Sequence, residues 1–368
     1  MLPLCLAVLA IIALWLMPDI RTEEVEAGMQ PREAWRGVVV DPEPPPPDPD
    51  DELSGFGQIV VELSEGPREG EQVRAFVQLQ STDASRADFD TGDEVVVTVT
   101  DDFDGSEFYA VAERYRLPVL GLLVLVFAIT MILVGGWQGL RAVVALGLTI
   151  VLVAKLFIPL LLDGYPPVAL AIGLALLVTV ASILLTEGVT RVGAVAIAGT
   201  IGGLLITAVL AALVTGAAEF SNTSVGELAY IVFPSGQSFD AGGILLAAII
   251  IGAVGVLDDV TVTQAATVDE LTSRSRHSVP RLYRRAMRVG RSHIAATTNT
   301  LFMAYVGAGL PALLFIIVIA DPTLLTLNRE VLALEVVRTL VGSVGIILAM
   351  PLTTIIAAWV FGHRGAET

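Results

Sequence analysis

The sequence is poor in the residues that build disulfide frameworks, metal sites and nucleic-acid interfaces. Its 368 residues include three histidines and one cysteine, Cys5, so no internal disulfide can form. The net charge of −17 argues against nucleic-acid binding, because such binding needs a basic surface. Charged residues make up only 16% of the chain. We therefore expect no nucleic-acid partner, no metal site and no cofactor.

Hydrophobic residues, in contrast, make up 54% of the chain, and the mean hydropathy is +0.76. They gather in several runs of about 20 residues, each long enough to cross a bilayer as a helix. The acidity lies in one segment, because residues 19–116 hold 25 acidic and 8 basic side chains, which accounts for the whole net charge. The composition predicts an all-α polytopic membrane protein with a small acidic, extracytoplasmic, β-rich domain.

Four parts are expected along the chain. Residues 1–18 read as an N-terminal signal anchor, with a cleaved signal peptide as the alternative. Residues 19–55 read as an acidic spacer, because 41–52 (DPEPPPPDPDDE) favours an extended, solvated backbone. Residues 56–116 hold four or five strand-like runs bounded by turn residues, which predict a small barrel or sandwich. Residues 117–364 read as a seven-helix membrane domain.

The seven helices are expected at 117–136, 142–162, 166–185, 192–214, 242–267, 294–320 and 336–361, and the first segment makes eight. Gly199 and Gly203, four residues apart, allow close helix packing, whereas Pro159, Pro311 and Pro351 can kink their spans. The loop 272–292 carries seven arginines and the loop 217–241 carries no basic residue. Cytoplasmic loops are enriched in Arg and Lys, so both termini are expected in the cytoplasm and the β-domain outside.

Two adjacent carboxylates, Asp258 and Asp259, lie where the sixth span should still be apolar. A charge at that depth is costly unless it is paired, hydrated or neutralised, which makes it a functional-site candidate. Adjacent helical residues point about 100° apart, so the pair cannot share one proton on a regular helix. Asp259 is expected to share a face with Thr263, Ala266 and Glu270, and Asp258 with Thr261 and Ala265. Gly252 and Gly255 are expected to loosen the helix just before the pair.

The seventh span supplies polar side chains at a similar depth, namely Thr297, Thr298, Asn299 and Thr300. Thr298, Asn299 and Thr300 are predicted to bind the carboxylates by hydrogen bonds. The alternative is a wetted helix end without a site. Lys155 and His293 are candidates for proton relay, although Lys155 also fits a side chain that snorkels near Asp163, and His293 an interfacial one.

The two hairpin stretches resemble the YibE/F family of bacterial membrane proteins. In the sixth span the resemblance rests on Gly252, Ala253, Gly255, Asp259 with Val260, and Glu270 with Leu271. In the seventh it rests on Gly290, Arg291, residues 298–301, Ala304, Tyr305, Gly307, Leu310 and Pro311. Near the end it rests on Glu335, Arg338, Gly342, Gly345, Pro351, Leu352 and Thr353.

The resemblance covers most of the chain from about residue 58. It implies this polytopic architecture in the plasma membrane of a bacterial cell, with a permease role. The family carries its aspartate at the position of Asp259, whereas the position of Asp258 is commonly uncharged. Asp259 is therefore predicted to be required more than Asp258, with Asn299 as its nearest polar partner.

Two functions remain after this reading. The first is a secondary transporter or permease for an ion or small solute, driven by an ion gradient because no P-loop occurs. The second is a membrane scaffold or assembly factor that presents the outer domain. Enzymatic hydrolysis is not expected, because no Ser/His pair lies within the membrane. The arginine-rich loop is predicted to bind anionic lipid, with Leu282, Ala286 and Val289 on one apolar face. A homo-oligomer is left open.

Overall fold

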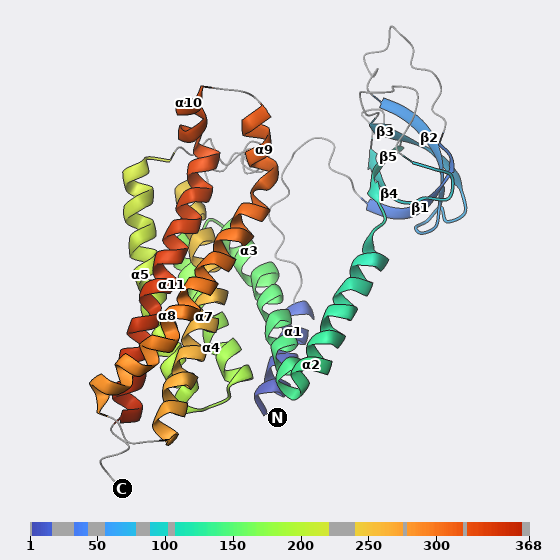
Figure 1. The fold of residues 1–368 in the computed structure, drawn as a ribbon. Helices are drawn as coiled ribbons and strands as arrows, with labels where there is room; N and C mark the ends of the chain where they lie inside the picture. The colour runs from blue at the N-terminus through green and yellow to red at the C-terminus, as the bar shows by residue number, and fades with distance from the viewer. Residues whose placement is uncertain are drawn as a thin grey trace. The chain divides into compact units, whose positions relative to one another are not determined.

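The computed structural model describes residues 2–16, 33–42, 56–78, 89–101, 107–220, 240–274, 278–318 and 322–362. The chain divides into two compact units, one of residues 26–129 and one of residues 1–25 and 130–368. Figure 1 labels the elements of both. Most of the expected acidic spacer and most of the loop 217–241 lie outside the described residues.

The first unit is a closed five-stranded barrel with strands in the order β1-β2-β3-β5-β4. Its strands are β1 (Glu33–Asp41), β2 (Phe56–Leu63), β3 (Gln72–Gln78), β4 (Glu94–Asp101) and β5 (Glu107–Arg114). Neighbouring strands are antiparallel except β3 and β5, which is the arrangement of an OB-type Greek-key barrel. The predicted β-rich domain is therefore a barrel.

Alternating side chains fill the barrel, as the period of two along a strand requires. In β4, Val95, Val97 and Val99 point inward and are buried, and in β2 Ile59 and Val61 do the same. The barrel begins earlier than expected, because β1 lies within residues 19–55. Strand β1 pairs with both β2 and β4 and so closes the barrel.

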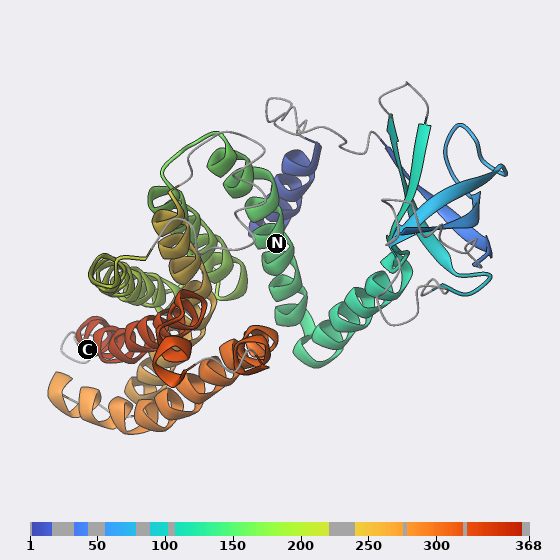
Figure 2. The same ribbon diagram turned by 90° about the horizontal axis from the view of Figure 1, so that it is seen from above.

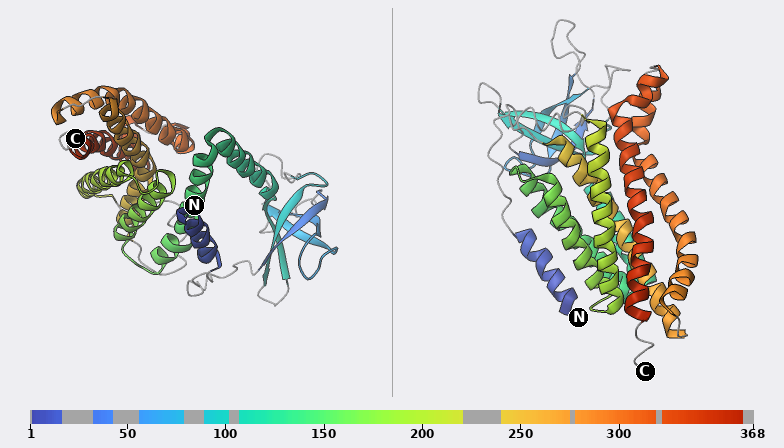
Figure 3. Two further views of the ribbon diagram at one scale, coloured as in Figure 1. Left: turned by 90° about the horizontal axis from the view of Figure 1, so that it is seen from below. Right: turned by 90° about the vertical axis from the view of Figure 1, so that its left-hand side faces the viewer.

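The second unit is helical. Its elements are α1 (Leu2–Leu16), the end of α2 (Leu117–Leu152), the π-helical turn η1 (Val153–Phe157), α3 (Ile158–Leu162), α4 (Pro167–Thr186), α5 (Arg191–Ala218), α7 (Ala241–Arg274), α8 (Val279–Ala308), α9 (Leu310–Val318), α10 (Thr323–Asn328) and α11 (Glu330–Gly362). Figure 3 shows α4, α5, α8 and α11 running alongside one another.

Within the described residues, five helical stretches are long and apolar enough to cross a membrane. They are Leu117–Leu162, Pro167–Thr186, Arg191–Ala218, Gly242–Thr272 and Leu332–Gly362. The first covers 46 residues and contains two of the expected spans, with a non-helical backbone at Gly136 between them (φ 56°, ψ −135°). Only glycine adopts this conformation readily, so Gly136 marks the break that the sequence placed there.

Helix α7 is the centre of the helical unit, because α4, α5, α8 and α11 all pack against it (Figure 2). Small residues bring the helices close, as expected. A Cβ atom on Gly199 would clash with the side chain of Thr353, and one on Gly203 would lie 2.8 Å from Ala349 Cβ. Helices in a bilayer gain no hydrophobic free energy from association, so the van der Waals contacts of such close packing stabilise the bundle instead.

Two of the three expected prolines lie next to irregularities of the helices. A π-helical turn, η1, precedes Pro159, and α8 ends three residues before Pro311, so the expected span 294–320 is split between α8 and α9. Pro351 lies inside α11. Helix α7 shows no such break, because it stays continuous through Gly252 and Gly255. The expected loosening of the helix at these glycines is therefore wrong.

Candidate functional site

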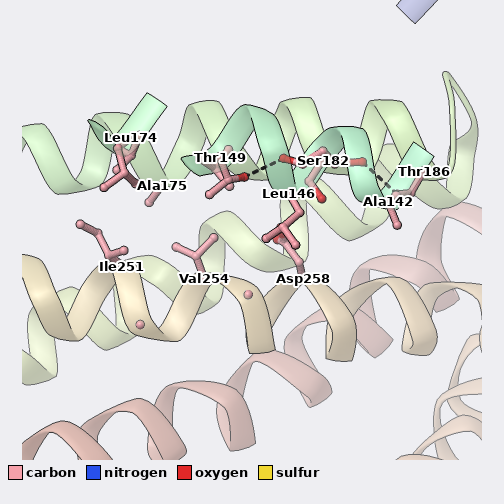
Figure 4. A pocket seen from close by; sticks show the side chains of 15 residues that line it. Ala142, Leu146, Thr149, Leu174, Ala175, Ser182, Thr186, Ile251, Val254 and Asp258 are labelled. Atoms are coloured by element: carbon pink, nitrogen blue, oxygen red, sulfur yellow. Dashed lines mark hydrogen bonds between the residues drawn. The ribbon is translucent and has the colours of Figure 1, made fainter. Parts of the chain in front are cut away.

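A pocket of about 410 Å³ lies among α2, η1, α4 and α7, and Asp258 lines it (Figure 4). Its walls are mostly apolar, as in most ligand sites. Its polar lining comes from Thr149, Ser182, Thr186 and Asp258. None of its fifteen lining residues is basic. The two glycines that were expected to break α7, Gly252 and Gly255, line it instead and leave room beside the helix.

Asp258 is held by a threonine of another helix. The hydroxyl of Thr179, on α4, donates a hydrogen bond of 3.1 Å to Asp258 Oδ1, and Thr179 is fully buried. One turn further along α7, Thr261 Oγ1 donates to the Asp258 carbonyl oxygen and lies 2.7 Å from Thr200 Oγ1 of α5. Thr200 and Thr261 are also fully buried. A polar cluster of α4, α5 and α7 thus surrounds the base of the carboxylate.

Two of the three hydroxyl groups that line the pocket, those of Thr149 and Thr186, donate their protons to backbone carbonyls. Thr149 Oγ1 donates to the Ala145 carbonyl oxygen and Thr186 Oγ1 to that of Ser182, as the dashed lines in Figure 4 show. The Thr179 proton is directed to Asp258. These hydroxyl protons are therefore engaged, whereas the oxygen lone pairs stay available. Hydroxyl and carboxylate oxygens are the ligands that hard cations prefer.

Asp259 lies on another face of α7. Its side chain is 65% exposed, and Asp259 Oδ2 lies 4.0 Å from His293 Nε2 of α8. Thr263, Ala266 and Glu270 are exposed on the same face, while Thr261 and Ala265 are buried. The expected division of α7 into two faces is therefore confirmed. The carboxylate that enters the helical core is Asp258.

The polar residues of α8 do not join the Asp258 cluster. Asn299 and Thr300 are exposed, and Thr300 Oγ1 donates to the carbonyl oxygen of Ala296 in its own helix. Thr298 Oγ1 is buried and has no hydrogen-bond partner within the described part of the chain. No hydrogen bond joins Asn299 to Asp259 among the described residues. Its neighbour across the contact with α8 is instead His293, which forms an ion pair with Asp259 only when the imidazole is protonated.

Lys155 lies in the π-helical turn η1, and its Nζ is 5.6 Å from the centre of the Trp15 ring of α1. This distance suits a cation–π contact. Lys155 does not line the pocket, although its neighbour Val153 does. The lysine side chain is therefore directed to α1 rather than into the Asp258 pocket.

A family model for YibE/F-like proteins matches residues 123–363. The chain belongs to the YibE/F-like family. The matched region contains α4, α5, α7, α8 and α11, and therefore the Asp258 pocket, whereas the five strands of the barrel precede it. No curated protein and no solved structure matches the chain. Family membership and the long apolar helices together make this YibE/F-like chain a membrane protein.

Sequence reasoning missed the polar residues of α4, which carry one side of the site. Thr179, Ser182 and Thr186 are spaced three and four residues apart, which places them on one face of an otherwise apolar helix. That spacing was a usable signal. It is weaker than the signal of a charged residue, because the hydroxyl of a threonine inside a membrane helix can donate its hydrogen bond to the backbone of the same helix.

Proposed function

We propose that this YibE/F-like protein is a secondary transporter or permease for a cation, a proton included, or for a small cationic solute, and that Asp258 is its binding carboxylate. The observation that carries the proposal is a carboxylate that lines a mostly apolar pocket without a basic residue, beside two threonine hydroxyls whose protons are engaged with the backbone. A charged side chain inside a membrane protein is energetically costly unless it is paired or hydrated. Such residues commonly mark the pathways of ions.

The proposed site differs from the hairpin site expected from sequence. Its carboxylate comes from α7, as expected, but its partners come from α4 and α5 rather than from α8. Asp259, Thr263 and Glu270 face away from it on the exposed side of α7. We therefore give Asp258 the role that the family resemblance suggested for Asp259.

Flux measurements on the full chain in liposomes test the proposal. The liposomes carry an imposed proton or Na⁺ gradient and an internal fluorescent reporter of that ion. We expect flux that depends on the protein and that falls to the level of empty liposomes for Gly255→Leu. A Cβ on Gly255 would meet no atom within 4 Å, so this leucine fills open pocket space without a backbone clash.

The matched control is Gly173→Leu on α4. Gly173 is exposed, lines no part of the pocket and also has no atom within 4 Å of a Cβ. It should keep its flux. Equal flux of H⁺ or Na⁺ in the two leucine variants would contradict the proposed role of the pocket, and no flux of either ion through the unmodified protein would exclude both as its substrate.

A scaffold role is the second candidate, and the barrel favours it. The barrel has its own buried core and forms a compact unit of its own. A membrane anchor that presents such a domain needs no solute pathway. This candidate predicts a specific pattern in a host strain whose growth depends on the protein. Deletion of the barrel should abolish complementation of that growth, whereas Gly255→Leu should preserve it.

The arginine-rich segment supports a proposal about lipids. It is mostly helical, since α7 continues to Arg274 and α8 begins at Val279. Leu282 and Ala286 are buried against α7 and α11, whereas Val289 is 52% exposed, so the apolar face is smaller than expected and covered by protein. Five arginines of α8 remain exposed, namely Arg281, Arg284, Arg285, Arg288 and Arg291. We infer that this cationic face binds anionic lipid at the cytoplasmic surface.

A further inference from the structure

A second pocket, of about 440 Å³, lies along the earlier part of α7 and meets the Asp258 pocket at Ile251 and Gly252. Phe157 and Leu161 form part of its apolar wall, and Tyr305 of α8 and Arg338 of α11 supply its polar atoms. None of these residues belongs to the Asp258 cluster. A cavity of this size can hold a small organic molecule.

The Arg338 guanidinium is only partly engaged. Its Nη1 donates to Glu335 Oε1 at 2.9 Å, one turn earlier on α11. Its Nε is buried and has no hydrogen-bond partner among the residues that the structure describes. A guanidinium carries five N–H donors in a rigid fork that suits carboxylate oxygens. A buried donor without an acceptor is costly, so this pocket is incomplete without one.

Tyr305 adds a hydroxyl to the same pocket. A Cβ on Gly252 would lie 2.6 Å from Tyr305 Oη, so the tyrosine hydroxyl rests directly against the backbone of α7. Glu335 is not among the lining residues, and the charged side chain that faces the pocket is Arg338. The polar end thus offers donors with a positive charge, whereas the Asp258 pocket holds a carboxylate and no basic residue.

We propose that this pocket binds the anionic end of a small amphipathic carboxylate, with the carboxylate on Arg338 and Tyr305 and the apolar tail along Phe157, Leu161 and Ile251. The Arg338–Glu335 pair orients the guanidinium, and Gly252 leaves space for the tyrosine hydroxyl. Carboxylate binding at this pocket does not depend on transport. A role of the pocket in the path of a transported solute does rest on the function proposed above.

Calorimetric titration of the full chain in phosphatidylcholine nanodiscs tests the site, with hexanoate as the probe and hexanamide as its neutral match. We expect hexanoate to bind about tenfold or more tightly than hexanamide, since a hydrogen bond to a charged group is at stake. Arg338→Lys keeps a cation beside Glu335 but removes the fork, and should weaken hexanoate binding about tenfold. Gly252→Ala, which displaces the tyrosine hydroxyl, should weaken it as well.

Arg191→Gln is the control, because Arg191 is exposed at the start of α5 and lines neither pocket. Equal binding of hexanoate and hexanamide, or an equal loss in Arg191→Gln and Arg338→Lys, would overturn the proposal. Addition of phosphatidylglycerol to the nanodiscs identifies the source of the anion. Competition with hexanoate would assign the pocket to a lipid phosphate and overturn the carboxylate proposal, whereas unchanged binding supports a soluble carboxylate.

Failure of this site and failure of transport are separable. If Arg338→Lys loses hexanoate binding but keeps its cation flux, the carboxylate site is supported as a site that transport does not require. Flux without any hexanoate binding in the unmodified protein rejects the pocket and leaves the Asp258 proposal standing.

Discussion

Thr179 is the residue on which the Asp258 geometry depends most directly. It is fully buried, and its hydroxyl donates to a carboxylate oxygen across the contact between α4 and α7. Thr179→Val keeps the shape but removes this donor, and should lower the free energy of unfolding by about 1–3 kcal/mol. Denaturant unfolding of the purified protein measures the change.

Thr186→Val is the matched substitution for that experiment. The Thr186 hydroxyl donates to the Ser182 carbonyl oxygen of its own helix, and no carboxylate depends on it. Its stability should change little. A loss as large as that of Thr179→Val would mean that the hydroxyl bond to Asp258 contributes nothing specific.

Tyr109 in the barrel provides a pH-dependent test. Its hydroxyl donates to Glu107 Oε2 at 2.6 Å, and burial, together with this hydrogen bond to the carboxylate, raises the pKa of Tyr109 to about 12. Because the pKa is higher in the folded state, the stability from neutral Tyr109 is complete below pH 10 and is lost as pH rises toward 12.

Thermal melts of the soluble barrel segment, residues 26–116, check this expectation. The segment should show a β-rich circular dichroism spectrum and a cooperative melt, because its core is its own. Its melting temperature should fall between pH 10 and pH 12, and Tyr109→Phe should flatten that fall. A fall of the same size in Tyr109→Phe would exclude Tyr109 as its origin.

At the scale of elements, periodicity was the informative signal. The 3.6-residue repeat placed Asp259 with Thr263 and Glu270, and Asp258 with Thr261, and the burial of α7 agrees. Periodicity alone does not say which face turns inward, since both carried one carboxylate. That choice depends on Thr179 of α4 and Thr200 of α5, which lie more than fifty residues before Asp258 in the chain.

The other differences also arise from tertiary packing. Strand β1 lies between acidic and proline-rich sequence, which favours a solvated spacer over a strand. Its pairing with β2 and β4 stabilises it as a strand instead. Gly252 and Gly255 do not loosen α7. Gly252 instead makes room for the Tyr305 hydroxyl, and Gly255 leaves open space in the pocket. A glycine in a membrane helix therefore indicates close approach or space as readily as a break.

For the whole molecule, the arginine distribution still predicts eight spans with the barrel outside and the α7–α8 connection in the cytoplasm. Single-cysteine labelling of a Cys5→Ala protein in intact cells tests it. A membrane-impermeant maleimide should modify Glu69→Cys, in the exposed turn after β2, and should leave Ser278→Cys unmodified until the cells are opened. Modification of Ser278→Cys in intact cells would contradict this topology.

Transport through the Asp258 pocket is the central claim, and flux in liposomes that carry Asp258→Asn or Asp259→Asn tests it most directly. Each substitution removes one charge and keeps the side-chain shape, so the two neighbours control for each other. We predict that Asp258→Asn lowers cation flux to the level of empty liposomes at normal amounts of inserted protein, whereas Asp259→Asn retains most of it. Full flux in Asp258→Asn, or loss of flux in Asp259→Asn alone, would contradict the account.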